Sequence, residues 1–74
     1  MRPNKTLLTL GSRIREQRLK QELTQEALAD SAGIATQLLS AIERGTEDLP
    51  LETLLRLATS LHTTAAELCD GIDD

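Results

Sequence analysis

Two residues of this chain could support catalysis or metal binding, and each residue type occurs only once: His62 and Cys69. One histidine and one cysteine cannot supply the four ligands of a structural zinc site within one chain. They also stand outside any nucleophile–base pattern, and the sequence contains no glycine-rich phosphate-binding loop. The sequence therefore argues against an enzyme and predicts no metal or cofactor. A single cysteine excludes an internal disulfide and is typical of proteins in the reducing cytoplasm, where we expect this chain to act.

Side chains suited to recognition gather instead in one segment, Gln25–Arg44, which reads QEALADSAGIATQLLSAIER. Ala29 is small enough to let two short helices approach closely, and Gly33 can adopt the left-handed conformation that a tight turn between them requires. Five apolar residues recur where both helices would face the rest of a domain: Leu28, Ala32, Ile34, Leu39 and Ile42. This pattern predicts a helix-turn-helix over residues 25–44.

Three predicted helices surround or form this segment. Apolar residues at spacings of three and four, beginning with Leu7, predict a first helix over about residues 5–21. A second helix is expected after the capping residue Thr24 and ends near Gly33. The third is expected over 36–44 and ends at Gly45 for the same reason.

Two more helices are predicted after a loop at Thr46–Pro50. The core face of the fourth is expected to hold Leu51, Leu54, Leu57, Ala58 and Leu61. Thr64 and Glu67 form a capping-box pattern for a short fifth helix ending near Cys69. No segment has the alternation of a strand. We therefore predict an all-α, five-helix domain covering residues 1–74, with its core over about 7–69.

Composition further narrows the class of binding partner. The chain has no Phe, Tyr or Trp, whereas surfaces that stack single-stranded bases normally depend on aromatic side chains. No apolar run approaches the roughly 18 to 20 residues of a membrane span. The net charge of −4 disfavours nucleic acid at first sight, but residues 1–45 carry seven basic and five acidic side chains, against one basic and seven acidic in 46–74. This asymmetry favours a DNA-facing half and a half turned away from DNA.

Several motifs in a fixed order make the pattern specific: IREQR (14–18), LTQEALA (23–29), AGI (32–34), SAIERG (40–45) and LETLLRLATSL (51–61). Over about residues 7–69 the chain resembles the phage repressor/Cro-type helix-turn-helix regulators, also called the xenobiotic-response-element family. The resemblance implies a repressor-like fold that binds double-stranded DNA and regulates transcription.

The resemblance also implies which residues contact bases. In the family the third helix enters the major groove, and exposed residues near its N-terminal end touch base edges. In this chain those residues are Thr36, Gln37, Ser40 and Ala41. Gln37 is the leading candidate, because a carboxamide can pair bidentately with adenine.

Contacts to the DNA backbone follow from the same resemblance. Gln25 matches the family glutamine that grips a phosphate beside a helix N-terminus. Further phosphate contacts are expected from Thr24, Arg13, Arg15 and Arg44. Arg18 and Glu43 resemble the family's ion pair, which joins the first helix to the end of the third and orients the reading helix.

Several positions depart from the family pattern. Gln17 stands where an apolar residue is usual, and Glu22 and His62 replace common glycines. Ala35 replaces the Ser or Thr that caps the third helix, a loss of about 0.5–2 kcal/mol unless Thr36 takes that role.

Two departures lie in the second half of the chain. Glu47 and Asp48 occupy a loop that often carries Lys or Arg, so these acids are expected to repel DNA. Cys69 falls at a bulky apolar core position, which predicts a buried thiol.

Leu8, Leu19 and Leu55 lie off the core stripes and are either scattered surface residues or part of a subunit interface. The family commonly dimerises through its C-terminal helices, and a two-fold pair would read half-sites roughly 34–36 Å apart. We therefore expect a homodimer on a partly palindromic operator, as in controller proteins, small repressors or antitoxins. The alternative is a module that binds a protein partner through the acidic C-terminal half. Strongly salt-dependent binding to duplex DNA would distinguish the two.

Overall fold

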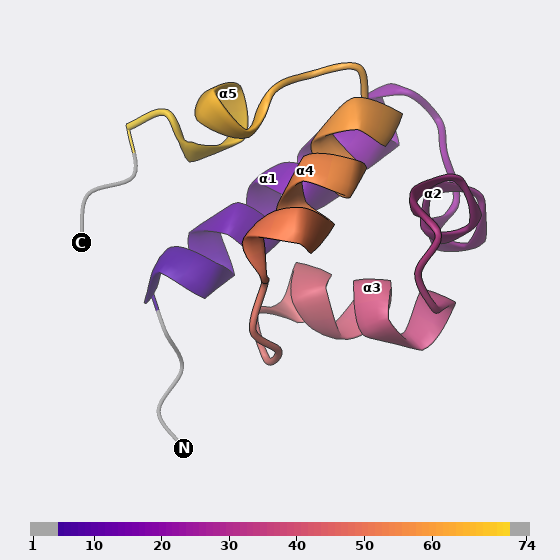
Figure 1. Cartoon of the computed structure of the whole chain (residues 1–74), viewed down its shortest axis with the longest axis horizontal. Helices are drawn as coiled ribbons and strands as arrows, with labels where there is room; N and C mark the ends of the chain where they lie inside the picture. Colours follow the sequence, from indigo (N-terminus) through magenta and orange to yellow (C-terminus); the bar gives the residue numbers. More distant parts are fainter. Residues whose placement is uncertain (1–4, 72–74) are drawn as a thin grey trace.

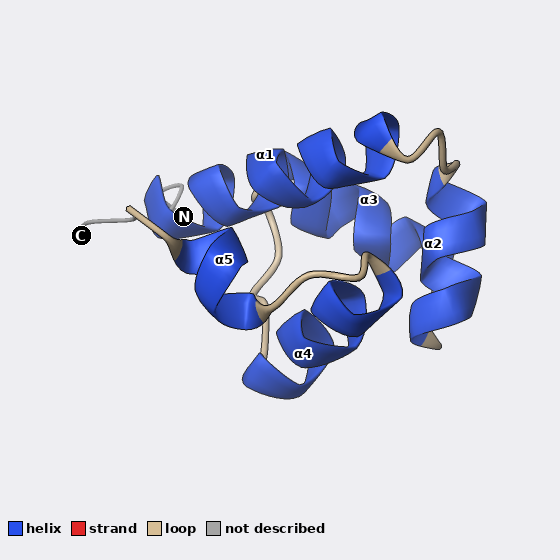
Figure 2. Ribbon diagram, turned by 90° about the horizontal axis from the view of Figure 1, so that it is seen from above, coloured by secondary structure: helices blue, strands red, loops and turns tan. Residues whose placement is uncertain are grey.

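The computed structural model describes residues 5–71, and within this range it contains five α-helices and no strand. The helices are α1 (Lys5–Lys20), α2 (Gln25–Ala32), α3 (Thr36–Arg44), α4 (Leu51–Ser60) and α5 (Ala65–Cys69). This is the predicted all-α, five-helix class. Figure 1 shows α4 in front of α1, with α3 along the lower edge and α2 and α5 at opposite ends. Figure 2, seen from above, shows α1 and α4 on opposite sides of the molecule.

Helix ends form where the local sequence predicts them. The Thr24 hydroxyl oxygen accepts a 3.0 Å hydrogen bond from the Ala27 backbone N–H and so caps α2. Thr64 caps α5 through the N–H of Glu67 in the same way, also at 3.0 Å. Gly33 ends α2 with φ 72°, a left-handed conformation that glycine adopts without steric cost.

The start of α3 lacks a side-chain cap. Ala35 takes the N-cap position, and its methyl group offers no hydrogen-bond acceptor. The helix begins at Thr36, so Thr36 does not move the cap one residue later. The departure noted at Ala35 therefore leaves the first N–H groups of α3 without a capping side chain.

The core lies between α1, α3 and α4, with α2 and α5 closing its ends. Its largest fully buried side chains are Ile14, Leu28, Leu39, Ile42, Leu57 and Leu61. α1 packs most extensively on α3, and Gly11 is what permits their close approach. A Cβ atom at Gly11 would overlap the carbonyl oxygens of Ile42 and Glu43 near the C-terminal end of α3. The sequence pattern had assigned no role to this glycine.

Three predicted core positions are wrong or only partly right. Leu51 was expected on the core face of α4, but it is 67% exposed, because it opens the helix one turn before the first buried leucine, Leu54. Cys69 was expected to be buried, yet it is only partly so: it occupies the last residue of α5 and packs against the edge of the core. Leu7 is likewise half-buried at the start of α1. Periodicity predicts the side of a helix and not the point at which the core ends.

Glu22 and His62 adopt positive φ angles of 57° and 58° just after α1 and α4. These are the two positions at which glycine is common in the family that the sequence resembles. Any side chain with a Cβ is strained in this conformation, at a cost of roughly 1–2 kcal/mol per residue. None of the helices within residues 5–71 is long and apolar enough to cross a membrane.

Candidate nucleic-acid interface

One side of α3 is turned away from the core and carries all four residues expected to contact bases. Leu39, Ile42 and Glu43 are buried on the opposite side. The outer side, which we call the α3 edge, consists of Thr36, Gln37, Ser40, Ala41 and Arg44. Gln37 and Arg44 are exposed and the other three are half-buried. No side chain of the α3 edge forms a hydrogen bond or ion pair with another residue of the described range 5–71.

A buried ion pair joins α1 to the core side of α3. The Arg18 Nε and Nη2 atoms donate to the Glu43 carboxylate at 2.7 and 3.0 Å, and Arg18 Nη1 donates to the Leu23 carbonyl at 2.9 Å. The structure thus places the expected pair in contact between α1 and α3. The side chains of Arg18 and Glu43 are 10% and 2% exposed, so water screens this pair very little.

The contact with Glu43 favours the charged form of Arg18. The hydrogen bond that the Arg18 guanidinium donates to Glu43 is the main cause that raises the pKa of Arg18 above its usual value, and the attraction of the carboxylate adds to it. Burial acts in the opposite direction, because it disfavours the charged form. Arg18 is therefore held as a cation in this pair, and its position depends on Glu43.

Gln25 extends the ion pair to a third helix. Its Nε2 atom donates a 3.0 Å hydrogen bond to Oε1 of Glu43, which connects the N-terminus of α2 to α3. This bond brings the start of α2 next to the C-terminal half of α3. Nε2 has a second N–H, which remains for another acceptor. Sequence reasoning missed this contact, since 18 residues separate the two side chains.

Arg15 and Arg44 remain near α3, whereas Arg13 does not. Arg44 is exposed at the last residue of α3. Arg15 is also exposed, and it follows Gly11 by four residues, so it shares the side of α1 that packs on α3. The Arg13 guanidinium instead donates to the Leu68 carbonyl at 3.0 Å and to the Asp70 carbonyl. Arg13 therefore links α1 to the end of α5, and its expected contact with a phosphate stays a prediction.

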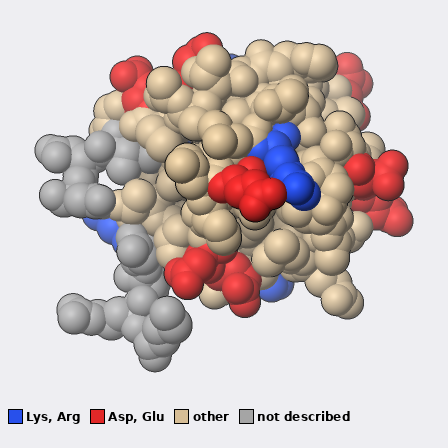
Figure 3. All heavy atoms as spheres, in the orientation of Figure 1, with Lys and Arg blue, Asp and Glu red and all other residues tan. Residues whose placement is uncertain are grey.

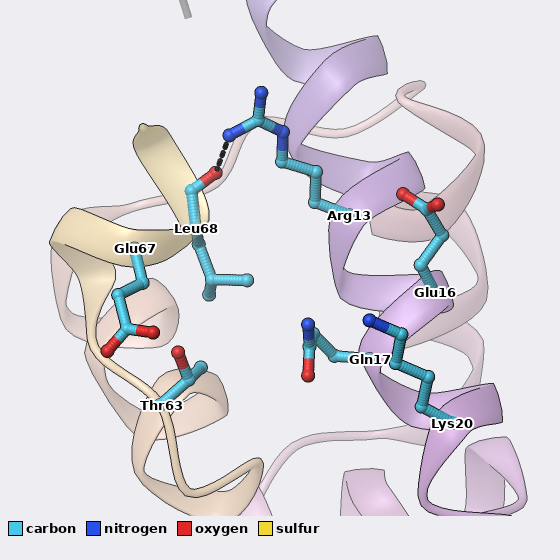
Figure 4. A pocket seen from close by; sticks show the side chains of 7 residues that line it. All are labelled: Arg13, Glu16, Gln17, Lys20, Thr63, Glu67 and Leu68. Carbon is cyan, nitrogen blue, oxygen red and sulfur yellow. Dashed lines mark hydrogen bonds between the residues drawn. The ribbon is translucent and has the colours of Figure 1, made fainter. Parts of the chain in front are cut away.

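Figure 4 shows Arg13 in its position between α1 and α5. A pocket of about 230 Å³ separates α1 from α5, and Arg13 reaches across its top to Leu68. Glu16, Gln17 and Lys20 project from α1 toward the same space. The half-buried Gln17, which departs from the family pattern, thus contacts a polar pocket and not the core.

Acidic residues border the α3 edge at both ends. Glu26 and Asp30 of α2 line a groove of about 540 Å³ that reaches Thr36 at the start of α3. Glu47 and Asp48 follow the end of α3 and are exposed. Figure 3 shows acidic side chains at the lower edge of that view, where Figure 1 places the loop between α3 and α4. A polyanion approaching α3 therefore meets negative charge on either side.

A model of the family described as helix-turn-helix matches residues 14–68. The chain belongs to the helix-turn-helix family. In this family the second helix of the motif is the one that enters the major groove. The motif of this chain is formed by α2 and α3, so the α3 edge is its candidate DNA-reading surface.

The chain is similar to named regulators. It is 37% identical over 58 residues to the cryptic phage CTXphi transcriptional repressor RstR of Vibrio cholerae, covering 78% of this chain and 52% of that protein. It is 35% identical over 66 residues to the HTH-type transcriptional regulator DdrOP3 of Deinococcus deserti, covering 89% and 51%. The helix-turn-helix chain thus spans about half the length of these curated relatives.

Solved structures cover the fold more fully. The restriction-modification controller protein C.AhdI from Aeromonas hydrophila is 37% identical with a TM-score of 0.82, over 84% of this chain and 94% of that one. SinR, the master regulator for biofilm formation, solved in complex with DNA, is 31% identical with a TM-score of 0.77, over 82% and 98%. The repressor-like helix-turn-helix fold expected from the sequence is confirmed.

Proposed function

We propose that the chain regulates transcription by binding a specific site on double-stranded DNA, as a homodimer on a partly palindromic operator. Membership of the helix-turn-helix family and the regulators among its relatives support DNA-binding regulation, with no enzymatic step, as the class of function. One observation supports binding to a specific site. The side chains of the α3 edge have no hydrogen-bond or ion-pair partner within residues 5–71, while a buried network of hydrogen bonds fixes the helix that carries them.

Each element has a role in this proposal. Gln37 reads a base through its carboxamide, and Thr36, Ser40 and Ala41 supply smaller contacts to base edges. Thr24 and Gln25 bind a phosphate at the N-terminus of α2, where the helix dipole favours an anion. Arg15 and Arg44 provide the remaining phosphate contacts from α1 and the end of α3. A regulator of this kind would act in the cytoplasm, where its operator lies.

The test is selection of bound sequences from a pool of random duplexes, repeated with Gln37→Ala. We expect a partly palindromic motif with half-sites roughly one helical turn, 34–36 Å, apart. Gln37→Ala should relax the motif at particular bases, each by about 1–3 kcal/mol of discrimination. Gln17→Ala is the matched control, because Gln17 lines the pocket between α1 and α5. Lack of enrichment at low salt, or equal relaxation by both variants, would contradict the proposal.

A second candidate function is a module that binds a protein through its acidic half. The exposed Glu47 and Asp48 next to α3, and the excess of acids in residues 46–74, favour it. Binding to a fixed duplex over a range of salt concentrations separates the two candidates. Phosphate contacts release counterions, so log affinity should fall by about 0.9 per contact for each unit of log salt. A flat salt dependence would favour the protein-binding module.

A further inference from the structure

The buried carboxylate of Glu43 accepts three hydrogen bonds, and one of them comes from a side chain that reaches the surface. Arg18 donates to Oε2 at 2.7 Å and to Oε1 at 3.0 Å from a buried position. Gln25 donates the third, also to Oε1 at 3.0 Å, from the first residue of α2, where it is half-buried. Because the charges of Arg18 and Glu43 cancel, this network supports the start of α2 without adding net charge to it.

The chemistry of Glu43 determines which way the Gln25 carboxamide is turned. An ionised carboxylate only accepts hydrogen bonds, so the amide must direct its Nε2 atom toward Glu43 and its Oε1 atom away. The amide group is planar, so the same bond constrains the direction of the second N–H. Neither that N–H nor Oε1 has a hydrogen-bond partner among residues 5–71. Gln25 therefore holds an unused donor whose orientation depends on a residue of the reading helix.

The other glutamines show that this arrangement is particular to Gln25. The side chain of Gln21 also crosses the domain, but it donates at 2.7 Å to the carbonyl of Leu61, which follows α4 and lies outside the helix-turn-helix motif. Gln17 and Gln37 form no side-chain hydrogen bond with any residue in 5–71. Of the four glutamines in the chain, Gln25 is the one that joins α2 to α3.

The accuracy of DNA reading depends on how α2 and α3 are joined. Contacts to phosphates set the position of a protein on the duplex, whereas contacts to base edges read the sequence. A phosphate contact at the start of α2 improves reading only if α3 is held at a fixed depth and angle relative to it. Supporting hydrogen bonds that lock the contacting side chains supply that precision. Within residues 5–71, the bond between Gln25 and Glu43 is the only side-chain hydrogen bond that joins α2 to α3.

We propose that Gln25 is a positioning residue that sets sequence specificity: its hydrogen bond to Glu43 holds α3 at a fixed depth and angle relative to the phosphate that α2 binds. A phosphate contact by itself raises the affinity for every duplex alike, but the link to Glu43 decides how strictly α3 reads its bases. Without the link, α3 can shift relative to the DNA backbone and accept a wrong base pair. The inference rests on the proposed DNA-binding function and identifies a residue on which its accuracy depends.

The test uses two duplexes that offer the same phosphates. One is the operator found by selection, and the other differs from it by one base pair at a position that Gln37→Ala relaxes. The ratio of their dissociation constants measures discrimination, and for the wild-type chain it should be about tenfold to a hundredfold. Gln25→Met keeps an unbranched side chain of the same length but cannot donate, and it should lower this ratio by about fivefold or more. Loss of a phosphate contact alone would raise both dissociation constants by the same factor and leave the ratio unchanged.

Two control variants separate positioning from stability and from phosphate binding. Gln21→Met makes the same substitution and also removes a hydrogen bond between distant segments, but it should leave both dissociation constants unchanged. Arg15→Gln removes an expected phosphate contact from α1, so it should weaken binding to both duplexes equally. Thermal melts followed by circular dichroism should show each variant folded, and Gln25→Ala repeats the test with a smaller side chain that also lacks the donor.

Three results would overturn the inference. The first is a ratio that both Gln25 variants leave unchanged, which would make Gln25 a phosphate contact and nothing more. The second is a ratio lowered as much by Gln21→Met or Arg15→Gln, which would make the effect general. In these two cases the chain still selects its operator, so the proposed function stands while the role of Gln25 does not. The third is a selection that enriches no duplex, which would contradict the proposed function as well.

Discussion

The α3 edge and the outward side of α4 are both exposed sides of short helices, but they differ in whether their polar side chains have partners. We call the outward side of α4 the α4 face; it consists of Leu51, Glu52, Leu55, Arg56 and Thr59. Gln37 and Arg44 on the α3 edge have no hydrogen-bond partner among residues 5–71. On the α4 face, Glu52, Arg56 and Thr59 are all paired within the helix. A surface with unpaired donors gains hydrogen bonds when it meets a polar ligand such as DNA. A surface whose donors are already paired gains chiefly by burying its leucines.

The two regions also differ in what lies beneath them. Behind the α3 edge, Glu43 accepts hydrogen bonds from Arg18 and Gln25, so one carboxylate joins three helices. Under the α4 face there are only packed side chains, with Leu54, Leu57 and Ala58 buried. Orientation matters for reading base edges, and the charged network supplies it. An apolar docking surface needs only a stable helix.

The largest expected effect comes from making the same change, glutamate to glutamine, once in each region. Glu43→Gln leaves the buried Arg18 charge uncompensated and should lower the free energy of unfolding by about 3–5 kcal/mol. Glu52→Gln breaks a pair whose side chains are 52% and 77% exposed, and should cost about 0.5 kcal/mol or less. Urea denaturation followed by far-ultraviolet circular dichroism is the measurement, because the chain has no aromatic residue for fluorescence.

Comparable losses of unfolding free energy from Glu43→Gln and Glu52→Gln would contradict this contrast between the two helices, because burial would then not distinguish the two ion pairs. A double variant, Arg18→Met with Glu43→Leu, sharpens it. Removing both charges should recover much of the stability lost by Glu43→Gln, while the orientation of α3 and hence DNA specificity should still suffer.

A smaller effect is expected from the acids beside the α3 edge. Neutralising the loop with Glu47→Gln and Asp48→Asn should tighten operator binding by about 1 kcal/mol, roughly fivefold, at low salt. The gain should shrink as salt screens the charges. The matched control is Glu67→Gln with Asp70→Asn, which removes the same charge from α5 and the residue that follows it. Equal gains from both pairs in a DNA titration would show that net charge matters and the position of the loop does not.

Much of the fold followed from local patterns. Apolar spacing and the residues Thr24, Gly33, Gly45 and Thr64 predicted the helices and most of their ends, because caps and left-handed turns depend on neighbouring residues alone. The positions of Arg13, Leu51 and Cys69 did not follow. The burial of Leu51 and Cys69 depends on where the core ends, and the contacts of Arg13 depend on the position of α5. The spacing of neighbouring residues encodes neither.

The candidate site divides in the same way. The base-contact residues of the α3 edge were predicted from the family resemblance, which assigns them together because they share one side of a single helix. The contact between Gln25 and Glu43 joins two helices, and the need for glycine at position 11 arises from carbonyl groups of α3. The pairing of polar groups on the α4 face was equally invisible, because exposure and partners are properties of the folded chain.

The smallest expected effect concerns the two strained residues that follow α1 and α4. Glu22→Gly and His62→Gly should each raise the free energy of unfolding by up to about 1 kcal/mol, because glycine adopts positive φ freely but gives up some entropy on folding. Glu22 precedes α2 and His62 follows α4, so equal gains would show that the strain is independent of either surface. Glu22→Ala is the control in urea denaturation: it removes the charge but keeps the Cβ. If Glu22→Ala stabilises as much as Glu22→Gly, the gain reflects lost charge, and backbone strain at φ 57° is not its source.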